Sequence, residues 1–307
     1  MTVQARDQAV ATTVAPPKTR RRAKKSPYPY WFYLPAFLVF FVFFLLPTGS
    51  SFYYGFTRWT LFDSEWIGLE NYKQFFSEPA LTKGLTNTLI YGVVTSGLKV
   101  VLGMLLAVLL TSTVLFRAFM RSVVFFPVLV STIGVGLTFV VLMEPDEGLI
   151  NDTLALVGIE GPKWLVNPNL ALFSVAFVDV WKGVGLATVI YIAGIVSVPR
   201  ELYEAARIDG ASSLASFRHV ILPLIRPATS TVIILSLIGG LRSFDLIWAM
   251  TRGGPGFSSD VIASVIYKQY QAGFYGLSTA GNVVLFILVT AIILPLFTWL
   301  NRREVQM

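Results

Sequence analysis

A polar segment in the middle of this hydrophobic chain is suited to binding another protein. It reads Glu-Ala-Ala-Arg-Ile-Asp-Gly-Ala from Glu204 to Ala211. Pro199 is a favourable first residue for a helix, because its fixed φ is helical and its missing N–H would have no partner there. Gly210 can adopt the left-handed conformation that ends a helix. A short helix with small residues on one face and a sharp exit fits a groove in a partner protein.

A second short helix is expected directly after the glycine. Ser212 or Ser213 can cap it, and it runs through Phe217 until Pro223 and Pro227 interrupt it. The resulting helix–Gly–helix unit occupies about residues 197–227. The residues expected to carry its contacts are Glu204, Ala205, Ala206, Asp209, Gly210, Ala211, Phe217, Leu222 and Pro223.

The polar side chains of this unit have separate expected roles. Glu204 either pairs with Arg200 or Arg207, which would orient the helix, or remains a solvated surface carboxylate. Asp209 can accept backbone N–H groups of the following turn. The alanines allow close approach of the partner, where larger side chains would separate the two surfaces.

Charged side chains also occur inside the apolar segments, where they are costly and usually face a cavity or a partner. Asp179 and Lys182 are three residues apart, as are Arg242 and Asp245, so each pair can share a helix face and form an ion pair. Such pairs would either serve a solute path or be purely structural. Lys99 is expected to extend its ammonium toward the membrane surface.

A site for a small polar solute combines flat, mostly apolar faces, such as those of aromatic rings, with a few hydrogen-bonding groups. The apolar segments contain both, although each aromatic residue is also compatible with helix packing or with a membrane-interface belt. The residues that offer this combination are Asn87, Tyr91, Trp181, Tyr191, Phe244, Asp245 and Trp248.

Several kinds of chemistry are excluded by the sequence. No Gly-x-x-x-x-Gly-Lys-Ser/Thr loop is present, so ATP hydrolysis by that route is not expected. Cysteine is absent and His219 is the one histidine, which excludes disulfides, thiolate sites and histidine metal clusters. The chain is therefore not expected to be an enzyme or to hold a cofactor. If transport is driven by ATP, then ATP and Mg²⁺ bind a separate ATPase subunit.

The elements that position these residues are membrane spans. Hydrophobic residues make up 55% of the chain and charged residues 13%, against about 45–50% and 25% in globular proteins. This composition predicts an all-α membrane protein, a bundle of about six transmembrane helices. The apolar segments are Tyr30–Tyr54, Leu85–Leu110, Phe119–Met143, Leu170–Val196, Ala228–Met250 and Thr279–Leu300.

The distribution of basic residues sets the expected orientation. With the N-terminus inside, 15 Lys and Arg residues fall on the cytoplasmic side and 6 on the outer side. Both termini and the 197–227 loop are therefore expected in the cytoplasm. Residues 1–27 are expected to form a disordered basic tail that also meets anionic lipid, ahead of a single membrane domain over 28–303. Nucleic acid is not an expected partner, because the basic residues flank apolar segments.

The 197–227 loop resembles the signature loop of ABC importer permeases. That pattern is Glu-Ala-Ala-x-x-Asp-Gly-Ala, then Phe, then Ile-Leu-Pro, and the Asp-Gly-Ala form with Pro227 is similar to the carbohydrate branch of the family. The resemblance covers roughly residues 30–303. Its further motifs are Gly68-Leu69-x-Asn71-Tyr72, Asn87-Thr88, Trp181, Ala193-Gly194, Glu201-Leu202-Tyr203, Phe244-Asp245 and Thr251-x-Gly253-Gly254-Pro255.

This resemblance implies one permease subunit of a binding-protein-dependent importer for a sugar or sugar-like solute. It implies a second permease subunit, two ATPase subunits and an extracellular solute-binding protein as partners, with the 197–227 loop as the helix that couples to the ATPase. Two alternatives are a secondary transporter or another multi-pass protein with a docking loop. A secondary transporter would be expected to show internal repeats, and no convincing repeat is present. A membrane-embedded enzyme would need a nucleophile or metal constellation that the sequence does not supply.

Overall fold

The computed structural model describes residues 29–60, 62–112 and 115–302. The basic tail predicted at residues 1–27 lies outside the described residues. Contacts divide the chain into two units, one that ends at Pro47 and one that begins at Thr48.

The first unit is helical throughout its described part. It contains the 3₁₀ turn η1 (Tyr30–Tyr33), α1 (Leu34–Phe40) and the π-helical segment η2 (Phe41–Leu45). α2 (Leu46–Tyr54) continues the helix into the second unit. Residues Trp31–Tyr54 form a helix of 24 residues with a mean hydropathy of 2.0, long and apolar enough to cross a membrane. The first predicted span is therefore confirmed.

Three unbroken spans belong to the second unit. They are α4 (Pro79–Thr111), α8 (Ala171–Ser197) and α15 (Tyr275–Asn301), with 33, 27 and 27 residues. α4 and α15 contain the apolar segments that the sequence predicted, and α8 begins one residue after the predicted Leu170. Among the described residues, four helices are therefore able to cross a membrane unbroken, and six spans result if two bent helix pairs are included.

The third and fifth predicted spans are not continuous helices. The third consists of α5 (Arg117–Leu129) and α6 (Thr132–Leu142), which meet at 98°. Pro127 weakens the end of α5, and the Ser131 hydroxyl caps a new helix. The fifth is α12 (Arg226–Leu241), which is long and apolar enough for a span only together with the bent segment Ser213–Leu224 before it. It does not reach Met250, because residues 242–244 leave the helix before α13 (Asp245–Met250) begins.

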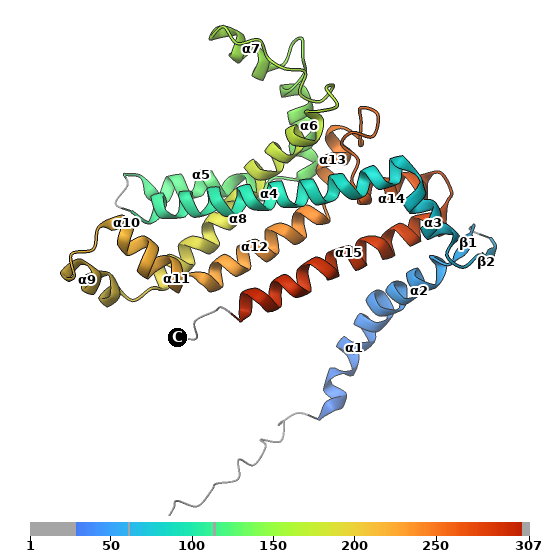
Figure 1. Cartoon of the computed structure of the whole chain (residues 1–307), viewed down its shortest axis with the longest axis horizontal. Coiled ribbons are helices and arrows are strands. Elements are labelled where there is room, and N and C mark those ends of the chain that lie inside the picture. Colours follow the sequence, from blue (N-terminus) through green and yellow to red (C-terminus); the bar gives the residue numbers. More distant parts are fainter. Residues whose placement is uncertain (1–28, 61, 113–114, 303–307) are drawn as a thin grey trace, which may run out of the picture. The chain divides into compact units, whose positions relative to one another are not determined.

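Close helix packing relies on the small residues of the spans. α4 contacts α8 and α12, and α12 contacts α15 (Figure 1). At Gly103 an added Cβ would lie 2.8 Å from the Ala187 Cβ, and at Gly240 one would lie 2.8 Å from the Gly92 Cα. These glycines therefore bring backbones together, as expected for helix contacts in lipid. Gly239 meets nothing within 4 Å, so packing does not require it.

Short elements connect the spans, and they include a feature that the all-α prediction lacks. β1 (Thr57–Trp59) pairs antiparallel with β2 (Ser64–Trp66) in a small hairpin. The other short elements are α3 (Glu70–Ser77), α7 (Leu149–Leu156), α9 (Arg200–Ile208), α10 (Ser213–Ser216), the π-helical segment η3 (Phe217–Ile221), α11 (Leu222–Leu224) and α14 (Ile262–Gln271).

Candidate functional site

The helix–Gly–helix unit predicted at residues 197–227, called the docking unit below, contains two short helices, α9 and α10, that meet at Gly210. This residue has a φ of 75°, so it occupies the left-handed region that favours glycine. Its N–H donates to Arg207 O at 3.1 Å, and the Ala211 N–H donates to Ala206 O at 2.9 Å. This pair of hydrogen bonds is the Schellman closure of a helix. The predicted role of Gly210 as the end of the first helix is confirmed.

The ends of the docking unit differ slightly from the prediction. Pro199 was expected as the first helical residue, but it is the extended N-cap residue of α9, and the helix begins at Arg200. Ser212 caps α10 by accepting a backbone N–H three residues later at 3.2 Å. The predicted interruption comes at Ile225, where the chain turns by 70° into α12. Pro223 and Pro227 lie in the first turns of α11 and α12, where the missing N–H costs little.

Apolar side chains project from this unit. Ile208 is 86% exposed and Leu214 is 76% exposed, and neither was in the predicted set. Their signal in the sequence was an apolar residue inside a polar loop. Among the predicted residues, Glu204, Ala205, Asp209, Gly210 and Leu222 are exposed, Ala211, Phe217 and Pro223 are half-buried, and Ala206 is buried.

Within the described part of the chain, the charged residues of α9 and of the turn at Gly210 are not fixed by ion pairs. Within the described residues, Glu204 has no Arg or Lys nitrogen within 4.0 Å, so its interpretation as a solvated carboxylate is favoured over pairing with Arg200 or Arg207. The expected hydrogen bonds to the Asp209 carboxylate are also absent from this part of the chain. The reason is that the backbone N–H groups of the turn donate to helix carbonyls instead.

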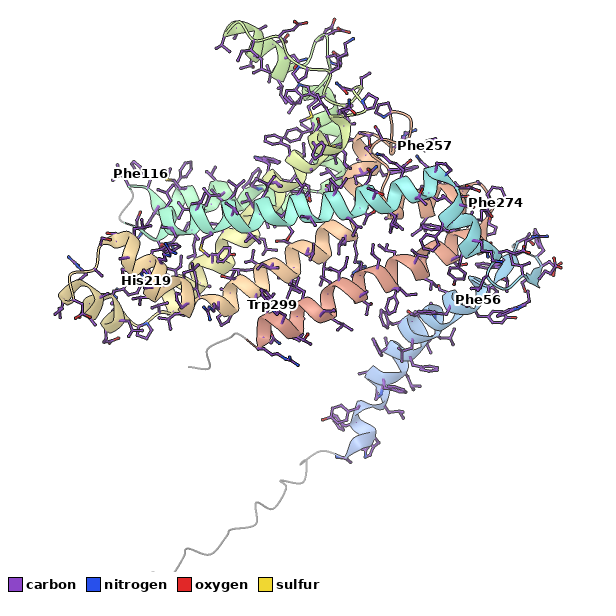
Figure 2. All side chains as sticks on the ribbon, in the orientation of Figure 1. Phe56, Phe116, His219, Phe257, Phe274 and Trp299 are labelled. Carbon is purple, nitrogen blue, oxygen red and sulfur yellow. The ribbon has the colours of Figure 1, made fainter. Side chains whose placement is uncertain are left out.

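Tyr203 joins the docking unit to a membrane span. Its hydroxyl donates to Ile195 O in the last turn of α8 at 3.3 Å, and burial raises the pKa of this phenol. Its ring packs against the cluster that contains Tyr191 and Val198. His219, on η3 of the same unit (Figure 2), places Nδ1 3.0 Å from Ala215 O, which agrees with a structural role. The hydrogen bond and the packing of Tyr203 therefore link α9 to α8.

The charged residues within the spans pair differently from the prediction. The Lys99 ammonium lies 2.8 Å from the Asp179 carboxylate, and both side chains are largely buried. Lys99 therefore does not extend to the membrane surface, and Asp179 does not pair with Lys182. Gly183 allows this arrangement, because an added Cβ there would lie 2.6 Å from the Lys99 Cε.

The second predicted pair is also absent. Within the described residues, no ion pair of 4.0 Å or less joins Arg242 to Asp245. Both residues are exposed. The i,i+3 geometry requires a continuous helix, and α12 ends at Leu241, before either residue.

Three of the candidate sugar-site residues are engaged in the core. Asn87 donates to the backbone carbonyls of Ser258 and Asp260, both at 2.8 Å, and so holds the loop before α14. Tyr91 and Tyr191 are fully buried, at 0% exposure each. These contacts give the three residues a packing role that the sequence did not separate from solute binding.

The remaining candidates present aromatic surfaces. Phe244 stacks on Trp248 with their ring centroids 5.7 Å apart, and Tyr267 meets Trp248 edge-on at 4.8 Å. Trp181 is 41% exposed, and its ring lies 5.3 Å from that of Phe139 in α6. The structure therefore groups Phe244 with Trp248 and joins Trp181 to a different aromatic neighbour.

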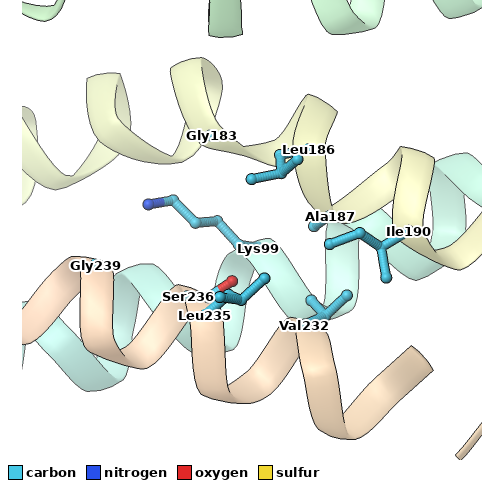
Figure 3. A pocket seen from close by; sticks show the side chains of 9 residues that line it. All are labelled: Lys99, Gly183, Leu186, Ala187, Ile190, Val232, Leu235, Ser236 and Gly239. Carbon is cyan, nitrogen blue, oxygen red and sulfur yellow. The ribbon is translucent and has the colours of Figure 1, made fainter. Parts of the chain in front are cut away.

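A cavity of about 190 Å³ lies between α4, α8 and α12. Figure 3 shows Lys99 extending between Gly183 and Ser236 at this cavity. Its other walls are mainly apolar, from residues such as Leu186, Ile190 and Val232. A charged side chain at the wall of an apolar cavity within a span is typical of transport proteins.

Comparison with known proteins agrees with this arrangement. The family of binding-protein-dependent transport system inner membrane components matches residues 99–306. The chain is 33% identical to the trehalose/maltose transport system permease protein MalF of Thermococcus litoralis, over 85% of this chain and 89% of that protein. It is also 33% identical to the probable ABC transporter permease protein YurN of Bacillus subtilis, over 86% and 92%.

A solved structure shares the fold. It is a chain of a bacterial ABC transporter involved in the import of the acidic polysaccharide alginate, with a TM-score of 0.77, 24% identity, and coverage of 89% of this chain and 94% of that chain. These relatives are permeases and not enzymes in their own right. The secondary-transporter and membrane-enzyme alternatives are therefore set aside. The chain belongs to the family of binding-protein-dependent transport system inner membrane components and is a membrane-embedded permease subunit of the ABC type.

Proposed function

We propose that this permease imports a sugar or sugar-like solute together with a second permease, two ATPase subunits and an extracellular binding protein. The observation that carries the proposal is the docking unit around Gly210, in which exposed Glu204, Ile208 and Leu214 surround a helix end that the backbone itself closes. The sugar class is supported by the relative named for trehalose and maltose. The Lys and Arg distribution supports a cytoplasmic position for the docking unit and both termini.

Coupling follows from the contacts of α9. ATP, bound with Mg²⁺ in the partner, favours the closed form of the ATPase pair and so biases the two conformations of the assembly. The docking unit moves with the ATPase surface that holds it. Tyr203 then transmits this displacement to α8 through its hydrogen bond to Ile195 O. Because α8 also carries Asp179, the movement reaches the charged centre of the solute path.

The test substitutes the glycine of the docking unit. Gly210→Val forces a β-branched residue into the left-handed region, at a cost of roughly 1–2 kcal/mol, and adds bulk at the ATPase joint. We expect normal abundance in the membrane, weakened co-purification of the ATPase and loss of solute uptake. Glu204→Lys should act in the same direction.

Gly158→Val is the matched control. Gly158 has a φ of 78° and ends α7 with the same closure, because its N–H donates to Ala155 O and the Ile159 N–H donates to Leu154 O, both at 3.0 Å. An added Cβ meets nothing within 4 Å at either glycine. Gly158→Val therefore introduces the same backbone strain away from the docking unit and should leave ATPase co-purification intact. Normal uptake in Gly210→Val would contradict the proposed coupling.

A further inference from the structure

We propose that the solute path selects solutes that carry an anionic group, and that Lys182 is the residue that recognises this group. The inference rests on the proposed import function and specifies the substrate class of the same path. The chemical class is a sugar acid or sugar phosphate.

The first observation is an unbalanced charge within the membrane. Asp179 and Lys182 lie one turn apart on α8, but the Asp179 carboxylate is already held by Lys99 at 2.8 Å. Within the described residues, no carboxylate lies within 4.0 Å of the Lys182 ammonium. The two lysines and one aspartate therefore leave one positive charge without a counter-ion. Such a charge is costly in lipid and is expected to face a polar path or a ligand.

The second observation is the depth of Lys182. At a rise of 1.5 Å per residue, it lies about 16 Å along α8 from Ala171 and about 22 Å from Ser197. The hydrocarbon core of a bilayer is about 30 Å thick, so Lys182 is near its middle. The ammonium is therefore placed to meet a solute within the membrane and not a lipid headgroup.

The third observation is the break in the third span beside this residue. The Lys182 Nζ lies 3.5 Å from Val128 O, in the last turn of α5. This carbonyl has no helical N–H partner, because α5 ends at Leu129 and the chain turns by 98° into α6. The carbonyl end of α5 attracts the ammonium but supplies only a partial negative charge. Non-helical backbone at this depth is tolerated where it is buried in protein or lines a cavity.

The fourth observation is the aromatic neighbour. Trp181, next to Lys182, is 41% exposed and lies beside Phe139 of α6. An indole face suits the C–H face of a sugar ring, and an ammonium suits a carboxylate or phosphate through charge-assisted hydrogen bonds. Trp181 and Lys182 therefore place an aromatic face and a positive charge at the same depth of α8, on neighbouring sides of the helix, which suits a solute that carries both a sugar ring and an acidic substituent.

A competing explanation is that Lys182 only caps the end of α5. Two substitutions separate the explanations. Lys182→Gln removes the charge but keeps an N–H donor for Val128 O, whereas Lys182→Arg keeps the charge. Lys163→Gln removes an exposed charge outside the spans and is the matched control.

The experiment uses the complete importer in proteoliposomes with its cognate binding protein. Galactose, galactobiose and glucose are each paired with their acidic counterparts: galacturonate, digalacturonate and glucose 6-phosphate. For wild type, we expect the acidic member of at least one pair to stimulate ATP hydrolysis and uptake at least about tenfold more than its neutral member. Lys182→Gln should lose this stimulation about tenfold in kcat/KM without loss of assembled complex, and Lys182→Arg and Lys163→Gln should retain it.

Each other outcome overturns the inference. Stimulation by neutral members alone, or equal stimulation by both members, would show that the path does not select anions. Wild-type behaviour of Lys182→Gln would assign recognition elsewhere, and loss of assembly in Lys182→Gln but not in Lys182→Arg would make the charge structural. If no sugar of either kind stimulates the importer but a solute of another class does, the proposed sugar function itself fails, and the inference fails with it.

Discussion

Two lysine–aspartate pairs in this molecule solve the problem of a buried charge differently. Asp260 and Lys268 are called the outer pair here, and Asp179 and Lys99 the inner pair. In the outer pair, the Asp260 carboxylate is fully buried. It accepts the Lys268 ammonium on one oxygen at 2.6 Å and the Ser264 hydroxyl on the other at 2.8 Å. In the inner pair, the Asp179 carboxylate is 22% exposed and receives the Lys99 ammonium at 2.8 Å. The outer carboxylate is fully buried, whereas the inner one is partly exposed.

The surroundings of the two pairs explain this difference. Asp260 belongs to a network in which Asn87 donates to the Asp260 backbone carbonyl and the Ile262 N–H donates to the Thr88 hydroxyl. These bonds tie the loop before α14 to α4. The Lys99 ammonium lies instead at the wall of a cavity. The comparison indicates that the outer pair fixes backbone geometry, and that the inner pair leaves charged side chains at a cavity between the spans.

The largest effect is expected from loss of the outer carboxylate. Asp260→Ala leaves Lys268 and Ser264 without their acceptor, and removal of one partner of a buried ion pair typically costs about 3–5 kcal/mol. We expect a severe loss of folded protein, measured as membrane abundance and as the thermal unfolding midpoint in detergent. Asp146→Ala, at an exposed carboxylate, is the control. Equal abundance of the two variants would show that the outer pair is dispensable.

A smaller effect is expected from a change beside the same carboxylate. At Gly253 an added Cβ would overlap the Asp260 carboxylate, and the φ of 85° adds strain for any other residue. Gly253→Ala should therefore displace Asp260 and lower the unfolding midpoint. Gly256→Ala has the strain of a positive φ, 53°, but meets nothing within 4 Å. A shift no larger than that of Gly256→Ala would mean that the contact with Asp260 has no structural consequence.

The smallest effect on folding is expected for the inner pair when both of its charges are removed. Lys99→Met or Asp179→Asn alone leaves one charge without its partner and should reduce abundance. The double variant removes both charges, and such replacements are often close to neutral for stability. We expect the double variant to regain abundance but to lose uptake. The corresponding Lys268→Met/Asp260→Asn variant should recover less, because Ser264 also depends on Asp260. Equal recovery of both double variants would remove the distinction between the pairs.

Local features were more predictable than distant contacts. The end of α9 followed from one glycine in a polar segment, and the spans followed from length and composition. The Lys99–Asp179 pair could not be predicted from spacing, because its partners lie on different spans and Asp179 had a nearer basic residue in Lys182. The breaks near Ser131 and Leu241 were also missed, because apolar composition continues through both positions and gives no sign that the helix stops.

The turn between α9 and α10 is held in shape by main-chain hydrogen bonds at Gly210 and a serine cap, and none of the described ion pairs involves the charged residues of α9. Ionic strength screens exposed charges over roughly 10 Å at 0.1 M salt but leaves such backbone bonds almost unaffected. The loop should therefore keep its conformation from dilute buffer to concentrated salt. Any salt dependence of transport then reports on the surfaces that meet this loop, and titration with salt becomes a direct probe of the proposed joint with the ATPase.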